Sequence, residues 1–191
     1  MARILMVAAE GLPFIKSGGL ADVIGSLPNE LAKKGHEVRV IMPLYLKIAQ
    51  KFHHEFTLEA QFSVSIAYHE VPVNIWSTMR KDVKFYFVEH KGYFEREEMY
   101  GHIDDGERFA YFQKAVIEMC NQLNYFPEIM HCHDWHTGMI PAMCKEGHSF
   151  DERYRNIRFV YTIHNLAYQG NFGVEMLDSC LGLDYRIYDN G

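Results

Sequence analysis

The pattern of apolar positions changes twice within the first 45 residues. An unbroken apolar run over residues 4–9 predicts a strand over residues 3–9 that is buried on both faces, as in a parallel sheet. Helical spacing follows, and residues 37–42 form a second strand-like run. The apolar positions at helical spacing are Leu20, Val23, Ile24, Leu27 and Leu31. This opening predicts a βαβ unit, with ligands expected beyond the carboxyl ends of its strands.

The rest of the chain adds shorter apolar runs and one more strong helix. Five of these runs predict strands, at residues 62–69, 71–78, 83–88, 129–132 and 158–163. The first two predict a hairpin insertion, residues 91–106 a surface loop, and residues 107–123 an amphipathic helix. We therefore predict one α/β domain, 1–191: a Rossmann-like, mostly parallel sheet with helices on both faces and a β-hairpin insertion.

Two adjacent glycines occupy the turn between the first strand and the first helix. Gly18 and Gly19 permit positive φ angles and a close approach to bare amides, while the helix start directs unpaired N–H groups at the turn. Lys16 adds a positive charge, and Asp22 can accept hydrogen bonds. The spacing matches neither a P-loop nor a dinucleotide fingerprint. The turn suits an anionic ligand, although a plain tight connection is the alternative interpretation.

Polar residues also follow two later strands. Residues 133–136 (HDWH) follow the strand at 129–132, and His164 and Asn165 follow the strand at 158–163. Because the carboxyl ends of parallel strands meet at one edge of a sheet, we expect these residues and the Gly-Gly turn to share one cleft.

Composition narrows the class of ligand and the compartment. The net charge of −6 and the scattered Lys and Arg argue against a nucleic-acid partner. No apolar run is long enough for a signal peptide or a membrane span, so a cytoplasmic location is expected. The four cysteines form no CxxC pair and predict reduced, buried thiols without a disulfide.

Two other kinds of function fit parts of the sequence. A metal-dependent hydrolase would use His131 and His133, which project to the same side of a strand, but no second ligand set with a recognisable spacing is present. A carbohydrate-binding module without chemistry would stack sugars on Tyr93, Phe94 and Trp135. The plainer interpretation of the aromatic residues in 91–106 is that they fix a long loop to the body of the protein.

Purely structural roles are also open for the residues after the later strands. Asp134 could cap the helix that follows it, and the His164 side chain could bond to backbone. A serine hydrolase is disfavoured, because no serine stands in a GxSxG elbow.

Taken together, three stretches resemble the bacterial and plant glycogen/starch synthase family. They are residues 16–23 (KSGGLADV), 133–138 (HDWHTG) and 161–170 (YTIHNLAYQG). Ser17 stands where the family usually has threonine. Residues 93–96, 100–101 and 108–109 also resemble the family, so the similarity spans essentially the whole chain.

The resemblance implies the N-terminal, acceptor-side half of a GT-B glycosyltransferase, in which two Rossmann-like domains face one another across a cleft. The C-terminal nucleotide-binding domain has no matching motifs here, and whether the N-terminal domain is complete at residue 191 stays open. The implied reaction is retaining transfer of glucose from ADP-glucose to the non-reducing 4-hydroxyl of an α-1,4-glucan such as glycogen or a maltooligosaccharide. No metal or cofactor is implied. We expect the isolated chain to turn over little or nothing, and a preference for UDP-glucose stays open.

The same resemblance assigns roles residue by residue. Asp134 would orient the reacting sugars, and His164 would contact the transferred glucose. Asn165 would support that loop, and Tyr93 would contact the substrate. The residues expected to hold ADP-glucose are Lys16, Gly18, Gly19 and Asp22.

Overall fold

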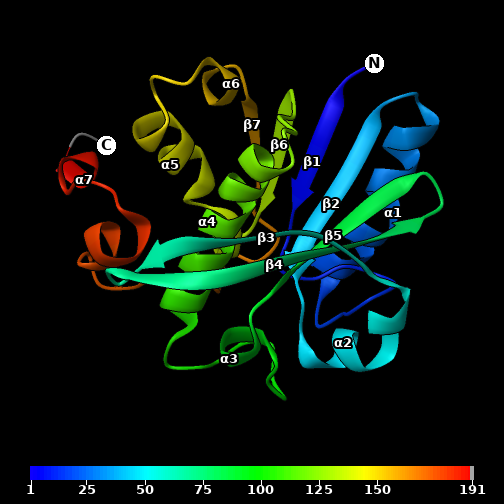
Figure 1. Ribbon diagram of the computed structural model, residues 1–191, viewed down its shortest axis with the longest axis horizontal. Helices are drawn as coiled ribbons and strands as arrows, with labels where there is room; N and C mark the ends of the chain where they lie inside the picture. Colours follow the sequence, from blue (N-terminus) through cyan, green and yellow to red (C-terminus); the bar gives the residue numbers. More distant parts are fainter. Residues whose placement is uncertain (190–191) are drawn as a thin grey trace.

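One mixed sheet runs through the computed structural model, which describes residues 1–189 (Figure 1). The strand order is β3-β4-β5-β2-β1-β6-β7. The strands are β1 (Arg3–Val7), β2 (Glu37–Pro43), β3 (Thr57–Ile66), β4 (His69–Arg80), β5 (Val83–Glu89), β6 (Ile129–His133) and β7 (Arg158–Thr162). β1 pairs with β2 and β6, β2 with β5, and β6 with β7, all parallel, whereas β4 is antiparallel to β3 and β5. The predicted Rossmann-like, mostly parallel sheet with a hairpin insertion is confirmed.

The hairpin is the element whose boundaries differ most from the prediction. β3 ends at Ile66, whereas the expected strand 62–69 continued through what is the turn. Ala67 and Tyr68 form this turn with positive φ angles of 47° and 66°. Both residues are unusual in a left-handed turn, which normally takes Gly, Asn or Asp, so residues 67 and 68 carry no turn signal.

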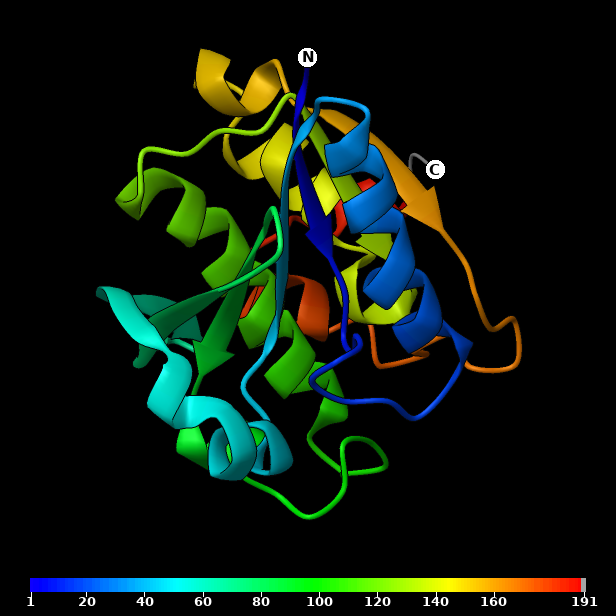
Figure 2. The same cartoon turned by 90° about the vertical axis from the view of Figure 1, so that its right-hand side faces the viewer.

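Helices cover both faces of the sheet (Figures 1 and 2). The α-helices are α1 (Gly19–Lys33), α2 (Leu46–Phe52), α3 (Lys91–Phe94), α4 (Asp105–Gln122), α5 (Ile140–Gly147), α6 (Glu152–Arg155) and α7 (Arg186–Asp189). The other helical segments are the 3₁₀ helices η1 (His53–Glu55) and η2 (Trp135–Thr137) and the π-helix η3 (Leu177–Leu181). α1 packs on one face, and α4 with α5 on the other. Among the described residues, no helix is both long and apolar enough to cross a membrane.

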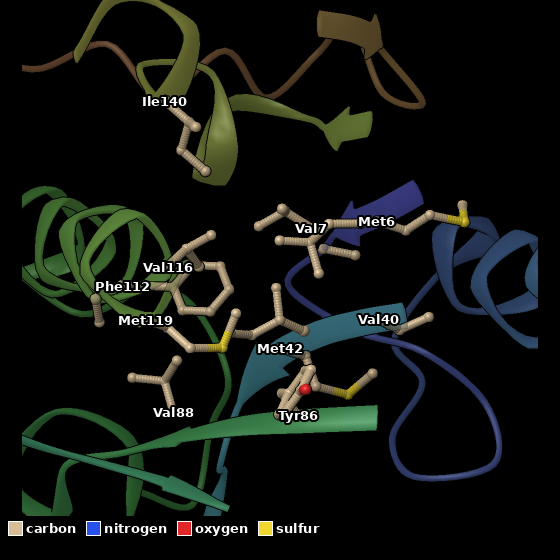
Figure 3. Close-up of a cluster of buried hydrophobic side chains, with 14 of the residues drawn as sticks. Met6, Val7, Val40, Met42, Tyr86, Val88, Phe112, Val116, Met119 and Ile140 are labelled. Carbon is tan, nitrogen blue, oxygen red and sulfur yellow. The ribbon is translucent and has the colours of Figure 1, made fainter. Parts of the chain in front are cut away.

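The core lies between the sheet and these helices. Figure 3 shows Phe112 and Val116 of α4 facing Val7 of the sheet, whereas Met6 and Val40 point toward α1. All five side chains are fully buried. Burial on both faces explains why β1 is a continuous apolar run rather than an alternating one.

The segment before α4 is fixed to the body by its aromatic rings, as the plainer interpretation expected. Phe94 is fully buried, and the Tyr93 ring lies 5.0 Å from that of Tyr111. Arg96 binds both carboxylate oxygens of Asp104 at 2.6 Å. A buried Phe94 cannot stack on a sugar, so the surface proposed for a carbohydrate-binding module is not formed.

All four cysteines are buried free thiols, as predicted: Cys120, Cys132, Cys144 and Cys180. Burial raises the pKa of both Cys132 and Cys144 to about 12. These thiols are therefore protonated near neutral pH and act as small core residues.

Candidate functional site

The loops after β1, β6 and β7 leave the sheet at one edge. These strands are adjacent and parallel, with Val7 paired with Cys132 and His133 with Thr162. Figure 2 shows β1 and β7 pointing toward the same end of the molecule. The expectation of one shared edge is confirmed, and we call this edge, with the segments 10–22, 133–138 and 161–165, the rim.

Asp134 has a backbone conformation that is normally open only to glycine. Its φ of 58° and ψ of 176° cost of the order of 1–3 kcal/mol. The fold holds the residue there, because its N–H donates to the Thr162 carbonyl at 3.0 Å and its own carbonyl accepts from the Thr137 amide at 3.1 Å. Such strain concentrates at functional sites, and it marks Asp134 as the most constrained residue of the rim.

The Asp134 carboxylate bridges two loops. The His164 amide donates to Asp134 Oδ1 at 2.6 Å, and Asp134 is only 9% exposed. Its side chain makes no capping hydrogen bond to η2. The helix-cap interpretation is therefore wrong, and the carboxylate fixes the start of the segment after β7.

Three histidines lie side by side at the ends of β6 and β7. The rings of His131 and His133 have centroids 4.0 Å apart, and His133 Nδ1 lies 2.9 Å from His164 Nε2. His131 Nε2 lies 2.8 Å from the Thr162 hydroxyl. The His164 side chain thus bonds to another imidazole, and the expectation that it bonds to backbone is wrong.

This arrangement does not provide the ligand set that a metal-dependent hydrolase needs. The rings of His131 and His133 lie against each other, with centroids 4.0 Å apart and planes tilted by 30°, whereas metal ligands must aim their lone pairs at one point. Over residues 1–189, no group of three or more His, Cys, Asp or Glu side chains is placed to hold a metal ion. The hydrolase hypothesis therefore has no support in the geometry.

A buried carboxylate occupies the inner side of the Gly-Gly turn. Glu10, only 3% exposed, accepts a hydrogen bond from the Ser17 amide and from the Gly18 amide at 3.2 Å. Gly19 begins α1, and a Cβ there would have no neighbour within 4 Å. The side of the turn available to a ligand is therefore the Gly19 side. The sequence analysis missed Glu10, although its position directly after a buried apolar run was a signal.

Lys16 and Asp22 pair with each other. Lys16 Nζ lies 2.7 Å from both carboxylate oxygens of Asp22, and both side chains are about half exposed. The two predicted donor-binding side chains therefore lie together at the rim, and an anionic ligand would compete with Asp22 for Lys16.

Two tyrosines differ in how they relate to the rim. Tyr93 donates to Glu107 and packs on Tyr111 and His90, so its contacts are with α4 and the end of β5. The pKa of Tyr100 is raised, first by burial and then by the carboxylates of Glu10 and Asp134. The Tyr100 ring lies 4.9 Å from that of His136, so Tyr100 contacts the rim although it was not among the predicted site residues.

The segment after His164 is shaped by short-range contacts. Asn165 Oδ1 accepts from the Ala167 amide at 3.0 Å, so the side chain stabilises the turn in which it stands. Gly170 has a φ of 64°, and a Cβ there would approach the Trp135 ring to 2.4 Å. Trp135 in turn stacks on His136 with centroids 4.0 Å apart. This segment therefore folds back onto the residue that follows Asp134.

Comparisons with known proteins agree with this architecture. Glycogen synthases of Streptococcus agalactiae serotype III (strain NEM316) and Clostridium kluyveri are 45% and 44% identical over 189 residues, which is 99% of this chain and 40% of each relative. The catalytic domain of starch synthase IV from Arabidopsis thaliana, bound to ADP and acarbose, superposes with a TM-score of 0.86 at 29% identity. That match covers 97% of this chain and 38% of the plant chain. The chain thus spans about two-fifths of the length of these proteins.

The parallel sheet, with its glycine turn and two later polar loops at one edge, defines a GT-B type glycosyltransferase domain. The model of the starch synthase catalytic domain family matches residues 3–190. The chain belongs to that family.

Proposed function

We propose that this chain is the acceptor-side half of a retaining glucosyltransferase that moves glucose from ADP-glucose to the 4-hydroxyl of an α-1,4-glucan. The observation that carries the proposal is the strained Asp134, bonded to the His164 amide on the rim that also holds the Gly-Gly turn. The glycogen synthase relatives and the plant starch synthase bound to ADP and acarbose support the same chemistry.

The proposed roles follow the charges that glycosyl transfer develops. ADP leaves with negative charge, which suits the Gly19 amide at the start of α1 and the ammonium of Lys16. The anomeric carbon becomes electron-poor, and the Asp134 carboxylate offers a nearby electron-rich group, while the His164 ring would contact the transferred glucose. Asn165 holds the loop that carries His164. The proposed reaction uses no metal or cofactor.

One half of the site is not enough for catalysis. Enzymes lower reaction barriers by about 8–23 kcal/mol, whereas a helix terminus contributes only about 0.3–1 kcal/mol to binding an anion. The rest of the barrier lowering would come from a second Rossmann-like domain across the cleft, which is the proposed partner of this one. We therefore expect the 191-residue chain to bind ADP-glucose weakly and to transfer little or no glucose, and we propose a cytoplasmic location for the whole enzyme.

The test is incorporation of labelled glucose from ADP-glucose into glycogen by the full-length protein. Asp134→Asn keeps the shape of the side chain but removes its charge, so it should lower kcat more than it weakens donor binding. Asp82→Asn is the matched control, because Asp82 is exposed and precedes β5 at the opposite edge of the sheet. Equal turnover by wild type and Asp134→Asn would refute the proposal.

A further inference from the structure

His133 is a buried polar residue that the proposed chemistry does not use directly. Its side chain has no exposed surface, and its Nδ1 lies 2.9 Å from Nε2 of His164. Its own Nε2 is buried without a hydrogen-bond partner within the described residues. Burying an unpaired polar atom costs free energy, so an apolar side chain would serve better if packing were the only role of this position.

The contact between the two imidazoles fixes where their protons lie. One of the two facing nitrogens must donate and the other must accept. If His133 Nδ1 donates, its buried Nε2 is a bare acceptor and His164 carries its proton on Nδ1. If His164 Nε2 donates, the buried Nε2 of His133 is an orphaned N–H, and such groups are rare in folded proteins. The first arrangement is therefore favoured.

Two further features keep His133 in this state. Burial, together with the neighbouring His131 and His164, lowers the pKa of His133 to about 3, so the ring is neutral near neutral pH. The His131 ring packs against it at a centroid distance of 4.0 Å and a tilt of 30°, which restricts its rotation. A neutral, immobile imidazole offers His164 one fixed donor.

We propose that His133 is a positioning residue, which holds the His164 ring through the Nδ1–Nε2 contact and leaves the Nδ1–H of His164 to donate to an oxygen of the sugar substrate. The proposal rests on the proposed function, in which His164 contacts the transferred glucose. It adds a defined proton position and a partner for that contact.

Two amide variants of the full-length protein separate positioning from packing. His133→Asn places an amide atom where Nδ1 stands, whereas His133→Gln places one near the position of Nε2. Loss of the group that orients a functional histidine typically costs about 10–100-fold in function. We expect His133→Asn to stay within about 3-fold of the wild-type kcat and His133→Gln to lose about 10-fold or more. Donor KM should change less than kcat in both, and equal kcat values for the two variants would overturn the proposal.

A spectroscopic measurement on the unaltered 191-residue chain tests the proton position without any variant. Long-range ¹H–¹⁵N correlation spectra of ¹⁵N-histidine-labelled protein distinguish the two neutral tautomers of His164. The proposal predicts that His164 carries its proton on Nδ1 near neutral pH. A proton on Nε2, or a mixture of tautomers, would overturn it.

The variant His164→Ala of the full-length protein separates this proposal from the proposed function. If that variant transfers glucose as fast as wild type, His164 has no part in the reaction and the proposed function loses that residue. If His164→Ala is slow while His133→Asn and His133→Gln are equal, only the positioning role of His133 fails.

Discussion

The backbone strain at Asp134 predicts that a glycine at this position gives a more stable protein than an alanine does. Asp134→Ala and Asp134→Gly both lose the hydrogen bond from the His164 amide. Only glycine adopts a φ of 58° with a ψ of 176° without strain. The difference between the two variants therefore isolates the backbone term.

The size of this difference follows from two opposing terms. Relief of strain is worth about 1–3 kcal/mol, and the greater freedom of glycine in the unfolded chain costs about 0.5–1 kcal/mol. Asp134→Gly should therefore be more stable than Asp134→Ala by up to about 2.5 kcal/mol. Both variants should be inactive in the full-length protein, because the carboxylate is gone.

Urea unfolding of the 191-residue chain, followed by tryptophan fluorescence, measures this difference. The control pair is Asp82→Gly and Asp82→Ala, since Asp82 is exposed and is not among the described residues with positive φ. There the glycine variant should be the less stable of the two. If Asp134→Gly is less stable than Asp134→Ala by as much as the Asp82 glycine variant is less stable than its alanine variant, the strain inferred at Asp134 does not exist.

Three further predictions concern stability and association. Burial lowers the pKa values of His133 and His136 to about 3. Below about pH 6.5 the unfolded chain therefore binds more protons than the folded chain. The free energy of unfolding should fall by up to about 1.4 kcal/mol per pH unit per histidine toward pH 3. Urea titrations across that range check this, and a flat profile would contradict it. Gly170→Ala should destabilise the protein by about 1–3 kcal/mol, because Gly170 has a positive φ and lies against the Trp135 ring. Gly147→Ala should not, because open space surrounds that position. Equal urea midpoints for the two variants would contradict this. Val160→Lys, on the exposed edge strand β7, should reduce concentration-dependent self-association in analytical ultracentrifugation, and an unchanged sedimentation profile would count against it.

The sequence was sufficient to predict the parallel part of the sheet and the edge at which its polar loops meet. Strands buried on both faces are read directly from continuous apolar runs, and the polar residues after β6 and β7 stand out at their ends. The shared edge then follows from parallel pairing alone. The hairpin was placed less well, because its turn at Ala67 and Tyr68 uses residues that rarely take positive φ.

The contacts within the rim were beyond sequence reasoning. Glu10 and Gly18, Lys16 and Asp22, and His133 and His164 meet only after the loops have folded against each other. The strain at Asp134 could not be predicted either, since an aspartate in the sequence does not indicate a glycine-like backbone angle. Tyr93 was selected from an aromatic cluster, and its contacts are with α4 and the end of β5.

If the rim is half of a sugar-nucleotide site, ADP-glucose should bind there. An NMR titration of the ¹⁵N-labelled 191-residue chain with millimolar ADP-glucose checks this. Backbone amide signals should move at Gly19, Asp134 and His164 and stay fixed at Asp82, on the opposite edge. Shifts confined to that opposite edge, or no shifts at any concentration, would contradict it.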